Sequence, residues 1–550
     1  MIRTFNTHKI RTSTELDGFW KIKNPQTKKE YELLVPGGAE AIMELQNFQG
    51  VLQYYREFEL EQEQNMLFTF HGVSFWATVF LDEVEIARHY NAFTAFTAFV
   101  PSIKAGNHVL RVEVDNRFSE ASSLHIPNDY FSYNAINRPV QMDVVGNEWI
   151  EYVHATPLEK NNGWEVQVTG QIHSLQLQQG MMAEIEIDGI KEMTQIAVDG
   201  SFVTTIELKK ATSWSPQTPN LYFVTTHLLK DGVIVDDLIE RTGFRSVKVS
   251  DGKILLNDKP VFLKGFCRHE DAPIWGNALP FEMMVHDIDI LKHLNCNSVR
   301  TSHYPNDQRF LDLCDEQGIL VWEENHARGL SEQDMQNPSF KIQCKECNEE
   351  MVLQHYNHPS IYVWGILNEC ASDTPYGREC YAEQFAQIRA LDQTRPLTFA
   401  SCKFFTDICL DLVDIVSMNL YAGWYHDTPP QIYVKQISEW VKRVGGQNKP
   451  LIISEFGAGA IYGFHDYLGR IKWSEERQAD LLEEQITAYL NDPDVQGLYI
   501  WQLTDCKVCE SWAEKRPKCE NNKGVVDRYR RPKMAYECVK KLFESKDKIR

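Results

Sequence analysis

The stretch Ile361-Tyr-Val-Trp-Gly-Ile-Leu-Asn-Glu369 is a run of mostly apolar residues that ends in an asparagine and a glutamate. The stretch Leu451-Ile-Ile-Ser-Glu455 repeats the pattern with a second glutamate. Strands this apolar are typical of a parallel sheet that is covered on both faces. A carboxylate at the end of such a strand lies where the sheet opens to solvent, so we expect the two glutamates to face one pocket. Acid/base chemistry on glycosides requires such a pair.

The sequence on both sides of these stretches predicts a (β/α)₈ TIM barrel over residues 248–550. Apolar strand candidates alternate there with amphipathic helical segments, the pattern of a closed parallel sheet. Strands are expected at 261–267, 298–304, 320–326, 361–369, 397–401, 415–419, 451–457 and 497–505. Helices are expected near 282–295, 306–317, 340–357, 378–392, 431–445 and 475–491.

The first 247 residues are predicted to be all-β. Residues 1–145 contain evenly spaced alternating segments such as Phe75–Leu81 and His108–Val114, with no long helical pattern, which favours a jelly roll. Residues 146–247 show the same alternation over about 100 residues and fit an immunoglobulin-like β-sandwich without its cysteine pair. The predicted fold is therefore multi-domain, with two β-sandwiches followed by an α/β barrel.

Composition limits the partners that we expect. The net charge of −21 disfavours nucleic acid and anionic membranes. No apolar stretch approaches the roughly 20 residues of a membrane helix, and the first residues lack the apolar core of a signal peptide. A cytoplasmic protein is expected. The 13 cysteines are odd in number and show no disulfide framework. The pairs Cys344-x-x-Cys347 and Cys506-x-x-Cys509 are interpreted as reduced thiols, so no metal and no cofactor are expected.

Polar residues stand at the end of nearly every predicted barrel strand, where the active sites of such barrels collect. Any one of these residues can be explained as the solvated first residue of a loop, but this explanation accounts poorly for the full set. Asn368 has an amide that can bond a sugar 2-hydroxyl, and Tyr421 can hydrogen-bond a nucleophilic carboxylate. Retaining glycosidases hold their two carboxyl groups roughly 5–5.5 Å apart and inverting ones farther apart, which sequence does not measure. The strand-end residues are Arg268, His269, Arg300, Ser302, His303, Glu323, Glu324, Asn368, Glu369, Asn419, Tyr421, Glu455, Trp501 and Asp505.

Several longer motifs resemble those of glycoside hydrolase family 2, and within it the bacterial β-glucuronidases. The resemblance covers all three regions of the chain. The motifs are Leu16-Asp-Gly-Phe-Trp20, Trp214-Ser-Pro-Gln-Thr-Pro-Asn-Leu-Tyr222, Gly243-Phe-Arg245, Gly265-Phe-Cys-Arg-His-Glu-Asp271, Arg300-Thr-Ser-His-Tyr-Pro305 and Ser454-Glu-Phe-Gly457.

The resemblance implies a role for each glutamate. Glu369 would be the general acid/base with a raised pKa, and Glu455 the ionised nucleophile, with retention of configuration. The residues that match sugar-contacting positions of the family are Asn368, Tyr421, His303 and Trp501. Asn419 is also expected to contact the substrate. The resemblance also implies a sugar-binding role for the jelly roll and a homo-oligomer.

Other matches concern which sugar is accepted. Asn521-Asn-Lys-Gly524 matches the Asn-x-Lys motif of glucuronidases, in which Asn521 and Lys523 would grip the C6 carboxylate. Tyr425 resembles a further carboxylate contact. Asp129 matches a residue that reaches from the jelly roll to the sugar O4.

The chain departs from the family pattern at three positions. Cys370 follows Glu369 where relatives often have proline, and Pro517 stands where an arginine is expected before the Asn-x-Lys motif, with Arg516 beside it. Arg328 follows the third strand, where many relatives are apolar. An arginine there can contact an axial C4 hydroxyl, as in galacturonides, or it can be a surface residue that pairs with an acid.

The predicted function is that of a retaining exo-β-uronidase acting on β-D-glucuronides of small molecules or oligosaccharides. A β-D-galacturonidase is the close alternative because of Arg328. A β-galactosidase is disfavoured because Lys523 would face a neutral hydroxymethyl group. A noncatalytic carbohydrate-binding protein, from a different functional class, is disfavoured because Glu369 and Glu455 are both present.

Overall fold

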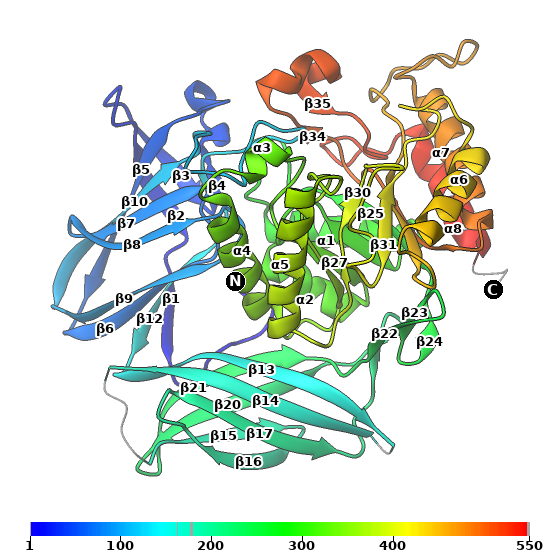
Figure 1. The fold of residues 1–550 in the computed structure, drawn as a ribbon. Coiled ribbons are helices and arrows are strands. Elements are labelled where there is room, and N and C mark those ends of the chain that lie inside the picture. The colour runs from blue at the N-terminus through cyan, green and yellow to red at the C-terminus, as the bar shows by residue number, and fades with distance from the viewer. Residues whose placement is uncertain (1, 162, 176–179, 547–550) are drawn as a thin grey trace.

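The computed structural model describes residues 2–161, 163–175 and 180–546. Figure 1 shows two β-sandwiches, one from the start of the chain and one below it, packed against a barrel that holds the second half of the sequence. The predicted multi-domain architecture is confirmed.

The first sandwich consists of two antiparallel sheets that enclose Trp20, Tyr54 and Phe68. In β7 (Trp76–Leu81) buried and half-buried residues alternate, so one face of the strand packs inward. One sheet has the order β1 (Thr12–Glu15), β12 (Val140–Val145), β6 (Gln64–Phe70), β9 (Phe96–Ile103). The other has the order β3 (Glu30–Val35), β2 (Gly18–Lys23), β5 (Val51–Leu60), β10 (Gly106–Asp115), β7, β8 (Val84–Tyr90). The short elements β4 (Gly37–Gly38), η1 (Ala39–Ala41), η2 (Met43–Leu45) and β11 (Ala135–Ile136) connect them.

The second sandwich is smaller and encloses Val166, Ile185 and Val224. Its sheets have the orders β13 (Glu148–Lys160), β14 (Gly163–Ser174), β17 (Ser201–Leu208) and β16 (Ile190–Gln195), β15 (Met182–Ile187), β20 (Tyr222–Lys230), β21 (Val233–Thr242). The connecting strands are β18 (Trp214–Ser215), β19 (Thr218–Pro219), β22 (Val247–Ser250), β23 (Lys253–Leu256) and β24 (Lys259–Pro260).

The barrel is a parallel sheet in which the predicted eight strands are found. The segment 397–401 forms two short strands on either side of Phe399, and these are the two ends of the strand order, so the sheet closes there. The order is β29 (Leu397–Thr398), β28 (Ile361–Gly365), β27 (Leu320–Glu324), β26 (Ser298–Thr301), β25 (Leu263–Arg268), β33 (Val495–Ile500), β32 (Leu451–Phe456), β31 (Val416–Asn419), β30 (Ala400–Ser401).

The six predicted helical stretches are all helices: α1 (Phe281–His293), α2 (Gln308–Gln317), α4 (Phe340–His355), α5 (Pro375–Leu391), α6 (Pro430–Arg443) and α7 (Glu475–Asn491). Helix α5 begins earlier than predicted because the Thr374 hydroxyl accepts a hydrogen bond from the Gly377 N–H and Pro375 follows as the first helical residue. The short α3 (Glu332–Met335) and the C-terminal α8 (Met534–Lys546) were not predicted.

The start of the chain joins the three parts. Arg3 donates two hydrogen bonds of 2.9 Å to Asp312 on helix α2 of the barrel. The backbone N–H groups of Lys9 and Ile10 donate to Asp237 on β21 of the second sandwich, at 2.6 and 3.0 Å. Because both carboxylates are buried, this segment fixes the barrel against the sandwiches.

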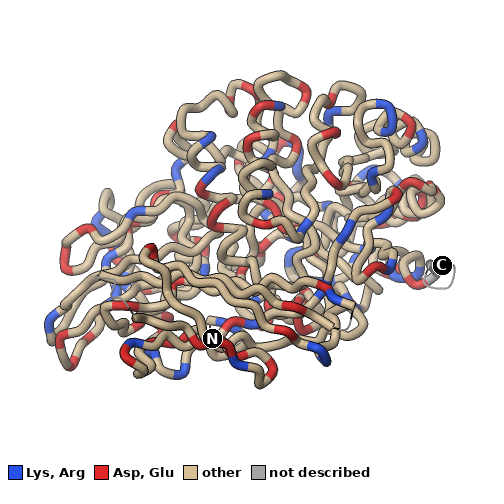
Figure 2. Tube along the Cα trace, turned by 60° about the horizontal axis from the view of Figure 1, so that its bottom comes forward, with Lys and Arg blue, Asp and Glu red and all other residues tan. Residues whose placement is uncertain are grey.

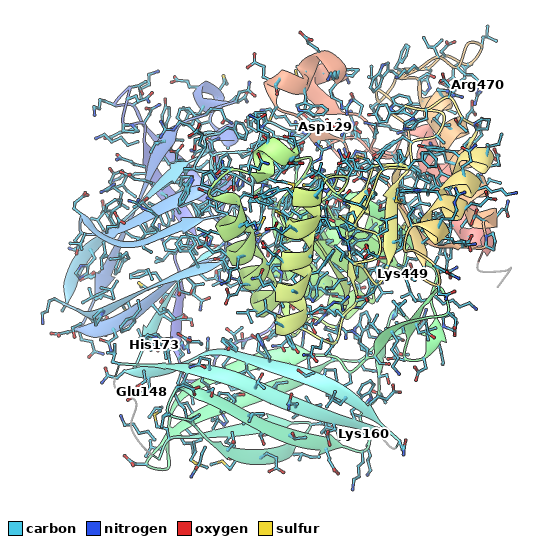
Figure 3. The ribbon with its side chains drawn as sticks, viewed as in Figure 1. Asp129, Glu148, Lys160, His173, Lys449 and Arg470 are labelled. Atoms are coloured by element: carbon cyan, nitrogen blue, oxygen red, sulfur yellow. The ribbon has the colours of Figure 1, made fainter. Side chains whose placement is uncertain are left out.

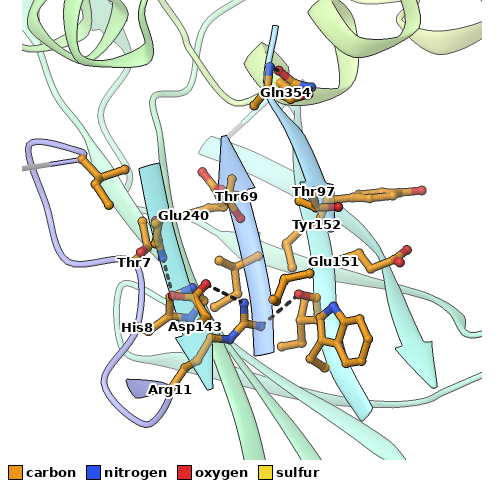
Figure 4. A pocket seen from close by; sticks show the side chains of 18 of the residues that line it. Thr7, His8, Arg11, Thr69, Thr97, Asp143, Glu151, Tyr152, Glu240 and Gln354 are labelled. Carbon is orange, nitrogen blue, oxygen red and sulfur yellow. Dashed lines mark hydrogen bonds and ion pairs between the residues drawn. The ribbon is translucent and has the colours of Figure 1, made fainter. Parts of the chain in front are cut away.

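A cavity of about 500 Å³ lies at this junction of the sandwiches and the barrel. Figure 4 shows Arg11 reaching toward Asp143 within it, beside Thr69 and Tyr152. The Arg11 guanidinium is already neutralised, since it lies 2.6 Å from Asp236 and 3.7 Å from Asp143. The cavity lining shares no residue with the strand-end cluster, so we assign the cavity to domain packing.

None of the helices in the described part of the chain is long and apolar enough to cross a membrane. Acidic and basic residues are interspersed along the trace rather than segregated (Figure 2). The negative charge is therefore spread over the molecule.

The Arg3–Asp312 pair makes stability depend on pH. Burial raises the pKa of Asp312, but Arg3 outweighs that effect and lowers it to about 2, from the ordinary 3.8. A depressed carboxyl pKa contributes stability above its unfolded value and loses it as the pH falls through the folded value. We expect Asp312→Asn to reduce the free energy of unfolding at pH 7 by about 2 kcal/mol, measured by urea unfolding, with the deficit shrinking from pH 4 toward pH 2.

Asp115→Asn is the control, because Asp115 pairs with Arg117 at the surface, where the two side chains are 26% and 58% exposed. It should change stability by less than about 1 kcal/mol at any pH. A deficit of Asp312→Asn that is the same at pH 7 and pH 3 would contradict the assignment.

Candidate active site

The two glutamates named by the sequence lie at the carboxyl ends of barrel strands. Glu455 is the fifth residue of β32 and is buried. Its Oε1 accepts a hydrogen bond from Arg300 at 3.0 Å, and its Oε2 accepts one from the Tyr421 hydroxyl at 2.9 Å. Both oxygens are thereby fixed in orientation, which suits attack along one direction.

Glu369 follows β28 and is less enclosed, with 20% of its side chain exposed. Its Oε1 accepts a hydrogen bond from the Asn419 amide at 2.9 Å, and its Oε2 lies 3.7 Å from the Arg328 guanidinium. The backbone N–H of Glu369 donates to Ala400, which anchors the residue on the neighbouring strand.

The pKa of Glu455 depends on its burial and on the neighbouring charges. Burial and the neighbouring charge of Glu369 raise the pKa of Glu455 to about 7, while Arg300, Arg328 and the Tyr421 hydroxyl act to lower it. The sequence predicted an ionised Glu455, whereas burial and the charge of Glu369 favour its protonated form below about pH 7.

Two buried polar atoms beside the glutamates have no hydrogen-bond partner within the described residues. They are Nδ2 of Asn368 and Nε2 of His303. The Oδ1 of Asn368 accepts from Arg300 at 2.8 Å, and the Nδ1 of His303 bonds Glu324 at 2.7 Å, so both side chains are held from one end. A buried polar atom without a partner is costly, and a sugar hydroxyl, which can both donate and accept, would satisfy either atom.

The Trp501 indole ring stacks on the His303 imidazole at 5.0 Å between ring centroids. Trp501 is 3% exposed and follows β33. Its face closes one side of the pocket.

A second group of predicted residues gathers around Lys523 and Tyr421, whose hydroxyl donates to Glu455. Lys523 lies 5.5 Å from the ring centre of Tyr425 and 6.0 Å from that of Tyr421, and its Nζ is 3.4 Å from Asn521 Oδ1. Lys523 and Asn521 are buried, and Nδ2 of Asn521 has no partner in the described structure. An ammonium and a free amide N–H thus lie close together, a combination that suits a carboxylate.

The jelly roll contributes Asp129, which Figure 3 shows close to the segment that contains β34 (Cys506–Lys507) and β35 (Glu520–Asn521). The Asp129 carboxylate accepts two hydrogen bonds from Arg516, one of them at 2.8 Å from Nε. Arg516 also lies 3.4 Å from the Tyr425 hydroxyl. Asp129 is therefore connected to the Lys523 group through Arg516.

Arg328 is largely enclosed beside Glu369, with 14% of its side chain exposed. Its Nη1 donates to Asn128 Oδ1 of the jelly roll, and its Nη2 lies near Glu369. The ring of Trp512, in η3 (Glu510–Lys515), lies 5.9 Å from the Arg328 guanidinium and 5.5 Å from that of Arg516. Arg328 therefore pairs with an acid, Glu369, as one of the two interpretations made from sequence held, but its side chain is more enclosed than that of a surface residue. A contact with a C4 hydroxyl stays a prediction.

The structure brings all twelve predicted site residues together and adds others. Arg300 and Glu324 were noted only as strand-end residues, yet Arg300 donates to Glu324, Asn368 and Glu455. Arg516 was noted only as a neighbour of Pro517, which stands where the family has an arginine, yet Arg516, just before η4 (Pro517–Cys519), donates to Asp129. Trp512 carried no signal in the sequence.

The structure also shows the state of the cysteines and one cluster of possible metal ligands. All 13 cysteines are free, and Cys344 and Cys347 are buried in helix α4. Asp312, Asp315 and His358 are close enough to one another to hold an ion. However, Arg3 binds Asp312 and His358 bonds Asp315 at 2.6 Å, so this cluster belongs to the domain junction.

Arg300 is predicted to be essential for both stability and catalysis. Replacing it by methionine leaves Glu324 and Glu455 buried without their cation, which typically costs about 3–5 kcal/mol in the free energy of unfolding. Glu455 and Asn368 would also lose the hydrogen bonds from Arg300 that hold them in place. This loss should lower kcat/KM at least about 100-fold. Urea unfolding and steady-state kinetics on an aryl glycoside measure the two effects.

Arg268→Met is the matched control. Arg268 is equally buried, but its partner Asp287 keeps a second cation, Arg530, at 3.0 Å. Its loss should destabilise the chain with a smaller effect on kcat/KM. Wild-type activity in a folded Arg300→Met protein would refute the anchoring role.

Comparison with known proteins places this arrangement in a family. The model for the TIM barrel domain of glycosyl hydrolases family 2 matches residues 247–547, and a second model described as glycosyl hydrolases family 2 matches residues 149–245. The β-glucuronidase of Streptococcus agalactiae is 26% identical over 97% of this chain and 96% of that protein.

Two solved structures are similar over nearly the whole length. The β-galacturonidase of Eisenbergiella tayi, bound to galacturonate, is 46% identical with a TM-score of 0.96, covering 99% of each chain. The β-glucuronidase of Bifidobacterium dentium, complexed with coumarin-3-O-glucuronide, is 25% identical with a TM-score of 0.89, covering 98% of each chain. The chain therefore belongs to glycosyl hydrolase family 2, and its chemistry is the hydrolysis of glycosides.

Proposed function

We propose that this protein is a retaining exo-β-uronidase with a preference for β-D-galacturonides over β-D-glucuronides. The observation that carries the preference is the largely enclosed Arg328 guanidinium, positioned between Glu369 and the jelly-roll residue Asn128. The 46% identity with a β-galacturonidase, against 24–26% for several solved β-glucuronidases, supports the same order.

The proposed reaction uses the two glutamates in turn. The Glu455 carboxylate attacks C1 of the sugar while the glycosidic bond breaks, and Glu369 gives its proton to the departing oxygen. Glu369 then takes a proton from water as the water attacks C1, and the bond between C1 and Glu455 breaks. Arg300 and Tyr421 fix Glu455 for the attack, and the amide of Asn419 orients Glu369.

Recognition of the sugar is assigned to the unpartnered polar groups. Lys523 and the free amide N–H of Asn521 would bind the C6 carboxylate, and the free N–H of Asn368 would bind the 2-hydroxyl. A neutral hexoside would leave Lys523 facing a hydroxymethyl group, which disfavours a β-galactosidase. The complete carboxylate pair and its anchors disfavour a noncatalytic carbohydrate-binding protein.

A glucuronide preference is the second candidate, and Asp129 favours it. A carboxylate near O4 can accept a hydrogen bond from an equatorial hydroxyl. However, Arg516 occupies both oxygens of Asp129, which reduces what the carboxylate can offer to a sugar. Arg328 keeps its Nε without a partner in the described structure, so it has a donor available.

Matched aryl β-glycosides test the preference. Wild-type enzyme without added metal should cleave the galacturonide with a higher kcat/KM than the glucuronide or the galactoside. Arg328→Met should lower kcat/KM for the galacturonide by about 10–100-fold, because a charge-assisted hydrogen bond is lost, and should affect the glucuronide less.

Lys515→Met is the control, since Lys515 lies 5.5 Å from the same Trp512 ring but is exposed. It should leave the galacturonide-to-glucuronide ratio unchanged. A higher kcat/KM for the glucuronide in wild type, together with no change of ratio in Arg328→Met, would reverse the proposed preference. A preference for galactoside would refute the role of Lys523.

The linkage between the carboxyls predicts a shift in pH dependence. Removing the charge of Glu369 lowers the pKa of Glu455, so the nucleophile stays ionised at lower pH. With a dinitrophenyl uronide, whose leaving group needs no acid, the acid limb of kcat/KM for Glu369→Gln should move down by about 1 pH unit or more. In wild type the limb should lie near pH 7, the pKa of Glu455.

Asp373→Asn is the control, because it removes a negative charge from the same loop and leaves Glu369 in place. Asp373 is a partly exposed carboxylate later in the same loop, with Lys403 at 4.0 Å. Its replacement should leave the acid limb in place. If the limb in Glu369→Gln stays where it is in wild type or moves to higher pH, the two carboxyls are not coupled as proposed.

A further inference from the structure

The loop that carries Asn521 and Lys523 is held by its backbone. Each of its four consecutive carbonyl oxygens accepts a hydrogen bond from outside the loop. The donors are Gln502 Nε2 to Asn521 O at 3.1 Å, Ala460 N to Asn522 O at 2.9 Å, Gln502 N to Lys523 O at 3.0 Å and Gln478 Nε2 to Gly524 O at 3.0 Å. Four such bonds in a row leave this segment little freedom to move.

Lys533, just before helix α8, is a bridge between this loop and the loop after β32. Its side chain is fully buried. Its ammonium donates to Ala460 O at 2.7 Å, to Asp505 Oδ1 at 2.8 Å and to Asn522 O at 3.1 Å. These three bonds use all three of its N–H groups.

Gln478 on helix α7 forms a second bridge between the same two loops. Its Nε2 donates to Ala458 O at 2.9 Å and to Gly524 O at 3.0 Å. Gln478 is completely buried, and in the described structure its Oε1 has no hydrogen-bond partner. Its side chain therefore acts through its two N–H bonds.

Gly524 allows the close contact on which both bridges depend. Its N–H donates to Asp505 Oδ1 at 2.8 Å. A Cβ at this position would lie 2.3 Å from the backbone nitrogen of Asp505 and 2.3 Å from the oxygen of Val526. Only glycine lets the loop lie this close to residue 505.

The two bridged loops carry the two ends of the proposed sugar site. Residues 458–460 follow the candidate nucleophile Glu455 on the same segment, and residues 521–524 carry the groups assigned to the C6 carboxylate. A sugar ring has a fixed distance between C1 and C6. Both ends can be engaged at once only if the two loops keep a matching separation, and an error of 1 Å can cost about 100-fold in rate.

We propose that Lys533 and Gln478 are positioning residues that fix the separation between Glu455 and the Asn521–Lys523 clamp, and so determine selectivity for uronides over neutral hexosides. This inference rests on the proposed function. Neither residue is assigned a contact with the sugar. Both act through the backbone oxygens of the two loops.

A purely structural role predicts something different. If the bridges only stabilised the fold, their loss would lower the yield or the unfolding midpoint and would reduce activity on all substrates in proportion. A positioning role predicts a change in the ratio between substrates, because a neutral hexoside depends on the nucleophile end but gains nothing from the clamp.

The test uses the full-length enzyme and the variant Gln478→Met, which removes two hydrogen bonds without exposing a charge. The measured quantities are kcat and KM for an aryl β-galacturonide and an aryl β-galactoside, and the binding of free D-galacturonate and D-galactose by calorimetry. We expect kcat/KM for the galacturonide to fall about 10-fold or more, with higher KM and weaker galacturonate binding, and that for the galactoside to stay within about 2-fold.

A second variant covers the case in which Gln478→Met does not fold. Lys533→Met alone would leave Asp505 buried and unpaired, so the double variant Lys533→Met/Asp505→Asn is used, and it should show the same change of ratio. Gln343→Met is the matched control. This buried glutamine bonds Ala121 and Ser123, away from the two loops, and its loss should leave the ratio unchanged.

The outcomes separate the two proposals. If folded Gln478→Met and the double variant keep the wild-type ratio and the wild-type affinity for galacturonate, the positioning role is wrong while the uronidase function stands. If wild-type enzyme cleaves no uronide and binds no galacturonate, the proposed function itself fails.

Discussion

The buried guanidinium of Arg300 is the interaction on which the site depends. It lies on β26 and reaches Glu324 on β27, Asn368 after β28 and Glu455 on β32. A charge that is fully removed from water must be paired and hydrogen-bonded, so these strand ends have one arrangement that satisfies it. That arrangement also aims Glu455 and the free N–H of Asn368 into the same pocket.

The proposed function divides catalysis and selectivity between the domains. The barrel alone provides both carboxyls and their anchors, whereas Asn128 and Asp129 come from the jelly roll and meet Arg328 and Arg516 of the barrel. Under this proposal the domain arrangement, fixed in part by the Arg3–Asp312 pair, is part of the substrate site. A change at the junction should affect which sugar is accepted more than the chemistry at C1.

The barrel and its glutamates could be predicted because the strands that carry them, β28 and β32, are fully buried and mostly apolar and are closed by polar residues, which is a local pattern. Arg516 and the bridge made by Lys533 could not. Whether Arg516 reaches Asp129 depends on the path of η4, and Lys533 meets Ala460 and Asn522 only after the chain has folded. The sequence contains these residues, but their contacts cannot be predicted from it, because the partners lie far along the chain and follow no spacing rule.

The buried cations of the pocket differ in how completely the protein neutralises them. Arg300 and Arg516 each bind a carboxylate of the protein at hydrogen-bond distance. No carboxylate of the described residues forms an ion pair with Lys523, whose neighbours are Asn521 and two tyrosine rings. A buried ammonium without a counter-ion is unfavourable, and a uronate would supply the missing charge. A neutral sugar would leave the cost in place, so discrimination of this kind can be large.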